Sequence, residues 1–274
     1  MLINCKGRLI DLRVPKIMGI LNLTPNSFYD GGKYKNKTEI LSQVEKMLSE
    51  GAHFIDIGAY SSKPSAEFVS EQEEMDRIVP VIELIMKHFP DTFLSIDTFR
   101  SEVAKAGIEN GAAIINDISA GELDPKMLEI IAQYNVPYIM MHMRGNPQTM
   151  QGLTQYDDIV KEMLFYFSEK VKKARNMGIN DLILDPGFGF AKTIDQNYEV
   201  LQKMELFNFL ELPILAGVSR KSMIYKTLNN SAHEALNGTT VLNTIALTKG
   251  AKILRVHDVK EAVECVTLFN KLNL

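Results

Sequence analysis

Residues that can bind a polar ring or an anion recur along this sequence, each at the end of a short apolar run. They are Asn22, Asp56, Asp97, Asn116, Asp117, His142, Asp185, Ser219, Arg220, Lys221, Arg255 and His257. Carboxylates and amides accept hydrogen bonds from the N–H edge of a heterocycle, whereas arginine, lysine and histidine donate to anions. The set predicts a site for a polar heterocycle that carries an anionic leaving group.

The apolar runs predict buried parallel strands, because they are short, rich in Ile, Val and Leu, and separated by longer amphipathic stretches. We expect strands at Ile17–Leu21, Phe54–Ile57, Phe93–Ile96, Ile114–Ile115, Tyr138–Met141, Leu182–Leu184, Ile214–Ala216 and Ile253–Val256. Helices are expected near Thr38–Ser49, Ser70–His88, Glu102–Asn110, Asp124–Gln133, Tyr156–Met177, Ile194–Met204, Ala232–Thr248 and Val259–Leu272. Eight such repeats predict an α/β protein of the (β/α)8 TIM-barrel class, in which the residues after each strand form one catalytic rim.

The whole chain, residues 1–274, is predicted to form a single domain. Its length lies in the range that one barrel fills, and no Pro/Gly/Ser-rich linker or low-complexity tract divides it. Before the first strand, the segment LINCKGRLIDL predicts a β-hairpin that turns near Lys6 and Gly7 and plugs the bottom of the barrel. We expect this hairpin to carry no chemistry.

The composition argues against several classes of partner. The formal net charge of −4 does not suit nucleic-acid binding, which needs a basic surface stripe. Cys5 and Cys265 are too few and too far apart for a disulfide framework or a metal knuckle. No signal peptide or membrane-spanning run is evident, so a cytoplasmic protein without a membrane partner is expected.

Two connections after predicted strands, residues 23–37 and 58–69, are longer than usual and predict lids or binding loops. The first contains NLTPNSFYDGG, whose Pro, Asn and Gly residues favour turns. Phe28 and Tyr29 in this loop are costly to leave in water, so we expect them to close over a flat ligand.

Seven segments taken together resemble the dihydropteroate synthase family of folate biosynthesis. They are MGILNLTPNSFYDGG, SIDT, NDI, MHMRGNP, DPGFGFAK, SRKSM and RVHDV, in that order, between about Ile17 and Val259. The first segment, DPGFGF and SRKS are specific, whereas SIDT or NDI alone would carry little weight. The resemblance implies the joining of 6-hydroxymethyl-7,8-dihydropterin pyrophosphate to p-aminobenzoate, with release of pyrophosphate.

The resemblance also implies which residues bind the pterin. Asp185 would accept two hydrogen bonds from the aminopyrimidinone edge, and Asp97 and Asn116 would complete the set. Lys221 would donate to the ring carbonyl, and Arg255 would stack on the ring and face the phosphates. Apolar walls and room for close approach are expected from Ile118, Met141, Phe190 and Gly217.

The catalytic set implied by the resemblance is Asn22, Lys221, Arg255 and His257. Arg255 and His257 would neutralise charge as the carbon–oxygen bond breaks, and Asn22 would act through Mg²⁺, the expected cofactor. Cleavage before attack would let the arylamine react without a strong base, so no Ser-His-Asp or Cys-His set is required.

The second substrate is expected at the two long loops and the start of a late helix. The p-aminobenzoate site implied by the resemblance comprises Phe28, Ser62, Lys63, Pro64, Phe190 and Ser222. The substrate carboxylate would lie near Ser222, at the N-terminus of the helix after the seventh strand, where free N–H groups favour an anion. The resemblance also implies a homodimer built on the late helices.

One loop departs from the family. Residues 61–65 read Ser-Ser-Lys-Pro-Ser, whereas the family pattern is closer to Ser-Thr-Arg-Pro-Gly. Lys63 keeps the charge but lacks the planar fork of arginine, and Ser65 lacks the freedom of glycine at positive φ. These differences put p-aminobenzoate affinity and sulfonamide sensitivity in question.

Three other functions are compatible with parts of the pattern. A pterin-binding methyltransferase would use a similar barrel and similar Asp and Asn contacts, but it would not need the first loop or the RVHDV anion site. A ligand-binding or regulatory protein could keep the pocket without turnover, and a steady-state assay separates it from an enzyme. A phosphosugar barrel enzyme is disfavoured, because no glycine-rich phosphate loop follows the seventh predicted strand.

Overall fold

The computed structural model describes residues 1–23, 33–60 and 69–272, and the side chains of all of these except residues 33–36. A closed barrel of parallel strands runs in the order β10-β3-β4-β5-β6-β7-β8-β9. Its strands are β3 (Lys16–Asn22), β4 (Phe54–Gly58), β5 (Phe93–Asp97), β6 (Ile114–Asp117), β7 (Tyr138–Met141), β8 (Leu182–Asp185), β9 (Ile214–Ala216) and β10 (Ala251–Val256). The prediction of a TIM barrel is confirmed.

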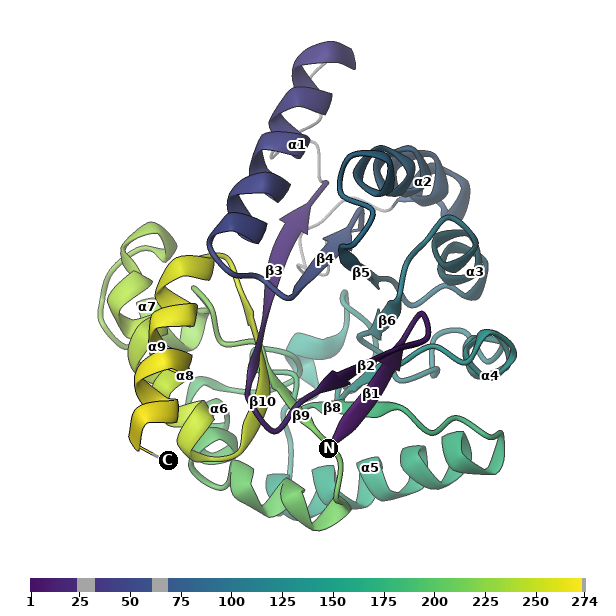
Figure 1. Ribbon diagram of the computed structural model, residues 1–274. Coiled ribbons are helices and arrows are strands. Elements are labelled where there is room, and N and C mark those ends of the chain that lie inside the picture. Colours follow the sequence, from purple (N-terminus) through teal and green to yellow (C-terminus); the bar gives the residue numbers. More distant parts are fainter. Residues whose placement is uncertain (24–32, 61–68, 273–274) are drawn as a thin grey trace.

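Helices surround the barrel (Figure 1). They are α1 (Lys33–Ser49), α2 (Glu71–His88), α3 (Ser101–Glu109), α4 (Met127–Tyr134), α5 (Ile159–Asn176), α6 (Ile194–Gln202), α7 (Ser222–Tyr225), α8 (Leu236–Thr248) and α9 (Val259–Leu272). Short 3₁₀ segments occur at η1 (Met150–Gly152), η2 (Met204–Leu210) and η3 (Ala232–Glu234). Among the described residues, no helix has the length and apolar character needed to cross a bilayer.

The helix predicted over Ala232–Thr248 is divided in the structure. Ser231 and Glu234 cap each other's backbone N–H groups in a capping box, which closes η3 as a single turn before α8 starts at Leu236. The helix expected to begin at Ser222 is present as α7, but it has only four residues and makes a single turn.

Successive residues of each strand face opposite sides of the barrel wall. On β4, Ile55 and Ile57 pack against the surrounding helices, whereas Phe54 faces the bottom of the barrel interior. Because side chains alternate along a strand, Asp56 lies on the same face as Phe54 and therefore also points inward. The same alternation on the other strands gives an apolar lower layer and a polar upper layer.

The N-terminal hairpin closes the lower end of the barrel. Strands β1 (Leu2–Cys5) and β2 (Arg8–Asp11) pair antiparallel and turn at Lys6 and Gly7, both at positive φ as a tight hairpin requires. Ile3, Cys5 and Leu12 are buried in one cluster with inward residues of the barrel strands. The predicted hairpin and its place at the barrel bottom are confirmed.

Candidate functional site

One arginine links three strands inside the upper end of the barrel. The Arg255 Nε of β10 donates to Asp56 Oδ2 of β4 at 2.6 Å, and an Arg255 terminal nitrogen donates to Asp97 Oδ2 of β5 at 2.7 Å. Asn116 on β6 donates its side-chain amide to Asp56 Oδ2 at 3.1 Å. These four polar side chains therefore form a continuous hydrogen-bonded network across the barrel interior.

Burial and charge shift the acid–base behaviour of this network. Burial raises the pKa of Asp97 to about 7 against the opposing pull of Arg255, and the neighbouring Asp56 adds to the rise. Burial disfavours the charged Arg255, but Asp56 and Asp97 together raise its pKa above the ordinary value. Asp56 is fully buried, and its Oδ1 has no hydrogen-bond partner among the described residues. The network therefore has unused acceptor capacity that faces the barrel interior.

Asp185 and Lys221 form a second charged part of the site, at the ends of β8 and β9. Asp185 Oδ1 accepts a hydrogen bond from the Gly187 N–H at 2.7 Å. Lys221 Nζ donates to the Phe188 carbonyl at 2.5 Å and lies 4.9 Å from the centre of the Phe190 ring. Burial raises the pKa of Asp185, with Lys221 opposing the rise, and burial lowers the pKa of Lys221 to about 8.

The sharp turn after β8 depends on a glycine. Gly187 has a φ of +66°, and a Cβ atom there would lie 2.3 Å from the His142 carbonyl oxygen. Any larger residue would push the turn away from β7. The glycine thus allows the backbone after Asp185 to fold back over the rim, where Phe190 joins the apolar cluster of the site while Phe188 is buried in the core.

Apolar residues form a wall beside the charged groups. Ile118, Met141 and Phe190 lie in one cluster, which also includes Phe99, Met143, Met150 and Ala191. At Gly217, a Cβ atom would stand 3.9 Å from Lys221 Nζ and 4.0 Å from Arg255 Cβ, so the missing side chain leaves space between these two cations. The structure brings all the residues expected around the ring to the same end of the barrel.

The residues expected at the anion also lie on this rim. Asn22 ends β3 and is exposed, and His257 follows β10, the strand that pairs with β3. His257 Nδ1 lies 3.1 Å from Ser219 Oγ. Partial desolvation at the rim and the nearby Arg255 lower the pKa of His257 to about 4, so its ring is neutral at neutral pH. This histidine can therefore serve as a hydrogen-bond donor rather than as a cation.

The expected p-aminobenzoate site is described only in part. Phe28, Ser62, Lys63 and Pro64 lie outside the described residues. Ser222 is the first residue of α7, as predicted, but α7 has only four residues. A single turn offers free N–H groups without the dipole of a longer helix.

Some polar residues at strand ends hold the fold together instead of facing the site. Asp117 faces outward and accepts hydrogen bonds from Ser119, Gly121 and the Tyr138 hydroxyl. Arg220 forms a bidentate ion pair with Asp258, with distances of 2.8 and 2.9 Å. The sequence did not distinguish these residues from the inward-facing set.

Two residues of the site were not assigned a role from the sequence. Asp56 was recognised only as a strand-end carboxylate. Its inward position follows because it lies two residues from Phe54 and therefore on the same face of β4. Lys192 ends the DPGFGFAK segment and is buried behind the turn after β8. The position of Lys192 at the end of the DPGFGFAK segment was the feature of the sequence that could have placed it near the site.

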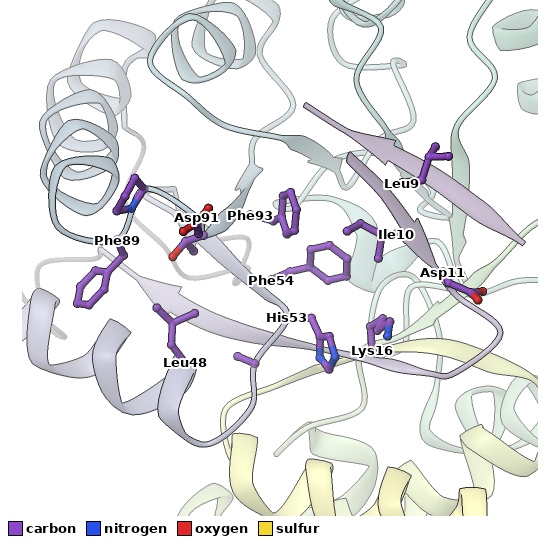
Figure 2. Close-up of a pocket in the computed structure, with 13 residues that line it drawn as sticks. Leu9, Ile10, Asp11, Lys16, Leu48, His53, Phe54, Phe89, Asp91 and Phe93 are labelled. Atoms are coloured by element: carbon purple, nitrogen blue, oxygen red, sulfur yellow. The ribbon is translucent and has the colours of Figure 1, made fainter. Parts of the chain in front are cut away.

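A cavity among the described residues lies at the opposite end of the barrel (Figure 2). It has a volume of about 630 Å³, and its lining includes Leu9, Lys16, His53, Phe54, Phe89 and Phe93. Figure 2 shows these side chains around the starts of β4 and β5, near the hairpin. In (β/α)8 barrels the amino-terminal end serves stability and the carboxyl-terminal end carries chemistry, so this cavity is separate from the candidate site.

Comparison with known proteins identifies the family to which the chain is similar. Residues 18–257 match the pterin binding enzyme family. A dihydropteroate synthase of Escherichia coli is 43% identical over 263 residues, which cover 95% of this chain and 93% of the relative. The relative of the same name from Bacillus subtilis is 42% identical over 258 residues, covering 93% and 88%.

Solved structures agree with this result. A Yersinia pestis dihydropteroate synthase in a sulfonamide drug complex has a TM-score of 0.93 at 41% identity, covering 100% of this chain and 99% of the other. A Xanthomonas albilineans dihydropteroate synthase in complex with 7,8-dihydropteroate has a TM-score of 0.89 at 34% identity, with the same coverage.

We predict that the carboxylate of Asp97 makes stability fall as pH rises from about 4 to 7. Its pKa is about 7 in the folded protein and near the ordinary value of 3.8 when the chain is unfolded, so the folded state holds the proton more tightly. This contribution is complete below about pH 4 and is lost as pH rises through 7. Urea unfolding at several pH values should show a smaller decline for Asp97→Asn over this range. Parallel curves for the two proteins would contradict the prediction.

Proposed function

Since the chain belongs to the pterin binding enzyme family, as one of its dihydropteroate synthases, we propose how the residues of the rim divide the work of the reaction. The reaction joins 6-hydroxymethyl-7,8-dihydropterin pyrophosphate to p-aminobenzoate and releases pyrophosphate. The observation that carries the proposal is the buried group of carboxylates, amide and cations at the carboxyl-terminal end of the barrel. These groups match the polar edges of a pterin.

The pterin ring lies between the two charged parts of the site in this proposal. Asp185 accepts two hydrogen bonds from the aminopyrimidinone edge, since its Oδ2 has no donor among the described residues. Asp97 and Asn116 bind the other ring nitrogens. Lys221 uses one N–H for the Phe188 carbonyl and has two left for the ring carbonyl and a ring nitrogen. Ile118, Met141 and Phe190 cover the ring faces, with Gly217 leaving room for it.

The diphosphate lies toward Asn22 and His257. Arg255 has two of its nitrogens engaged by Asp56 and Asp97, so its remaining N–H groups face the junction of ring and diphosphate. His257 donates one hydrogen bond from its neutral ring. Together these donors stabilise negative charge as the carbon–oxygen bond breaks.

Magnesium is the proposed cofactor, held by the side-chain oxygen of Asn22. No group of three His, Cys, Asp or Glu residues in the described part of the chain could hold an ion by itself. Mg²⁺ keeps several waters and commonly binds one or two protein oxygens together with substrate phosphates, so a single exposed Asn22 oxygen fits this requirement. When bound, the ion would neutralise charge on the diphosphate.

The arylamine attacks after the bond to the diphosphate has broken. The resulting cation is delocalised into the dihydropterin, and the amine nitrogen of p-aminobenzoate is already unprotonated at neutral pH, so no strong base is needed. Pyrophosphate leaves first with the bonding electrons; the amine nitrogen then forms the carbon–nitrogen bond and releases one proton to solvent. We place p-aminobenzoate beside Phe190 and Ser222, with Phe28, Ser62, Lys63 and Pro64 contributing from the two loops.

We also propose that the protein is a cytoplasmic homodimer. The two cysteines, Cys5 and Cys265, are both free and buried, which fits a reducing compartment. On the adjacent helices α8 and α9, Val241, Ile245 and Leu268 are 49%, 37% and 68% exposed. Apolar side chains grouped on two neighbouring helices suit a subunit interface.

Turnover is the direct test of the function. Purified protein supplied with Mg²⁺, the pterin pyrophosphate and p-aminobenzoate should form 7,8-dihydropteroate and pyrophosphate in equal amounts, measured by chromatography and a coupled pyrophosphate assay. Removing Mg²⁺ with a chelator should lower the rate, and adding it back should restore it. Tight pterin binding without product would instead indicate a ligand-binding protein.

Asp185→Asn should weaken pterin binding by about 2–4 kcal/mol, the scale of a lost buried charge-assisted pair. Isothermal calorimetry with 6-hydroxymethyl-7,8-dihydropterin measures this loss. Asp181→Asn is a matched control, because Asp181 lies near the start of β8 and accepts from the Asn4 N–H at the opposite end of the barrel. Unchanged affinity in Asp185→Asn would remove Asp185 from the pterin site.

The dimer is tested by sedimentation. The unaltered protein should sediment at about twice the 30.8 kDa of one chain. Ile245→Glu places a charge on the exposed face of α8 and should shift the protein toward monomer. Thr267→Glu on α9 adds the same charge at a polar exposed position and should leave the dimer intact. A monomer at all concentrations would exclude the proposal.

A further inference from the structure

Lys192 is a buried lysine directly behind the turn that follows β8. Its side chain is 6% exposed. Its Nζ lies 3.0 Å from His142 Nδ1, 3.0 Å from the Gly187 carbonyl oxygen and 3.0 Å from the Phe190 carbonyl oxygen. An ammonium group has three N–H donors, and each of them has a partner here.

These partners are unusual because none of them is a carboxylate. Among the described residues, no Asp or Glu oxygen lies within ion-pair distance of Lys192. Burial and the neighbouring Lys192 hold the pKa of His142 well below its usual value, so His142 is neutral and can accept. A buried ammonium without a contacting anion costs stability, so this lysine needs an explanation beyond packing.

The backbone that Lys192 holds carries several of the ligand contacts. Asp185 bonds to the Gly187 N–H, Lys221 bonds to the Phe188 carbonyl, and the Phe190 ring lies beneath the Lys221 ammonium. Lys192 bonds to the carbonyl groups immediately around these positions, those of Gly187 and Phe190. Removing it would take away two side-chain hydrogen bonds to the turn, and among the described residues the Gly187 carbonyl would keep only the bond from the Phe190 N–H at 3.1 Å.

Other side chains hold the outer part of the same segment. Asn197 of α6 accepts from the Gly189 N–H at 2.6 Å, and the Tyr156 hydroxyl donates to the Ala191 carbonyl at 2.9 Å. Neither reaches the carbonyls of Gly187 or Phe190. Lys192 is therefore the described side chain that bonds to the Gly187 and Phe190 carbonyls, in the part of the turn that follows Asp185.

We infer that Lys192 is a positioning residue for the pterin site, which fixes residues 186–191 so that Asp185, Lys221 and Phe190 are placed correctly before the ligand arrives. Its charge acts in the same direction, because the ammonium favours the ionised form of Asp185. Burial lowers the pKa of Lys192 to about 7, and Asp185 in turn favours its charged form. The inference rests on the proposed placement of the pterin beside Asp185.

The experiment compares Lys192→Met with the unaltered protein in two measurements. Methionine has a similar length but donates no hydrogen bond, so deuterium uptake should rise in peptides that span residues 186–191. The affinity for 6-hydroxymethyl-7,8-dihydropterin, measured by calorimetry, should fall about 10- to 100-fold, the range typical when a group behind a ligand contact is removed. Lys192→Gln keeps two N–H donors and should give an intermediate result; it carries the test if Lys192→Met does not fold.

Tyr138→Phe is the matched control, because it removes a different buried hydrogen bond, the 2.6 Å contact with Asp117 on the outer face of the barrel. It should lower the melting temperature without changing pterin affinity or exchange in residues 186–191. Unchanged affinity and exchange in the Lys192 variants would overturn the inference, and so would an equal loss of affinity in Tyr138→Phe. Failure of the unaltered protein to bind the pterin would instead reject the proposed pocket.

Discussion

The Arg255 guanidinium, shared by Asp56 and Asp97, is the interaction on which the site depends. It joins β10, β4 and β5 through the barrel interior, where Asp56 is fully buried and Arg255 and Asp97 are only partly exposed. Breaking a buried pair leaves an uncompensated charge, which is far more costly than losing a surface pair. Each member of the network therefore restricts the position of the others, and Asn116 is held by the same Asp56 oxygen. The site is ordered by its own charges before any ligand binds.

Burying these polar groups costs stability, which apolar contacts elsewhere in the barrel must offset. The lower layer provides these contacts, since Met18, Phe54, Ile114 and Ile183 are buried together with the hairpin residues Ile3 and Leu12. The hairpin covers apolar surface that would otherwise face water at the open lower end. Stability is thus concentrated at one end of the barrel and ligand binding at the other, so the two ends can be altered separately.

Much of this arrangement could be predicted from the sequence, because the spacing of apolar residues indicates the strands and the polar residues that follow them indicate the rim. Short apolar runs predicted all the barrel strands, and the positions of Asp97, Asn116 and Asp185 at strand ends predicted that they lie on one rim. The sequence could not show that Asp117 faces outward toward Tyr138, since neighbouring residues at a strand end differ only in orientation. Nor could the sequence show that Lys192 binds carbonyl groups. Every residue has a backbone carbonyl, so residue types do not reveal which carbonyls accept hydrogen bonds from a side chain. The break before Leu236 depends on local capping at Ser231, which a helical pattern does not resolve.

The charge balance of the site explains how an uncharged ring can be bound tightly there. Asp56, Asp97 and Asp185 face two cations, Lys221 and Arg255, so one negative charge is in excess when all are ionised. Without a ligand, the raised pKa of Asp97 relieves this excess by holding a proton near neutral pH. In the proposed placement, a pterin brings N–H donors to the same carboxylates and can replace that proton, while its diphosphate lies near Arg255 and His257. Because the donors and charges are fixed in advance, little reorganisation is needed when the carbon–oxygen bond breaks. In the proposed mechanism, this preorganised charge stabilises the departing diphosphate, and the arylamine needs no catalytic base because it is already unprotonated.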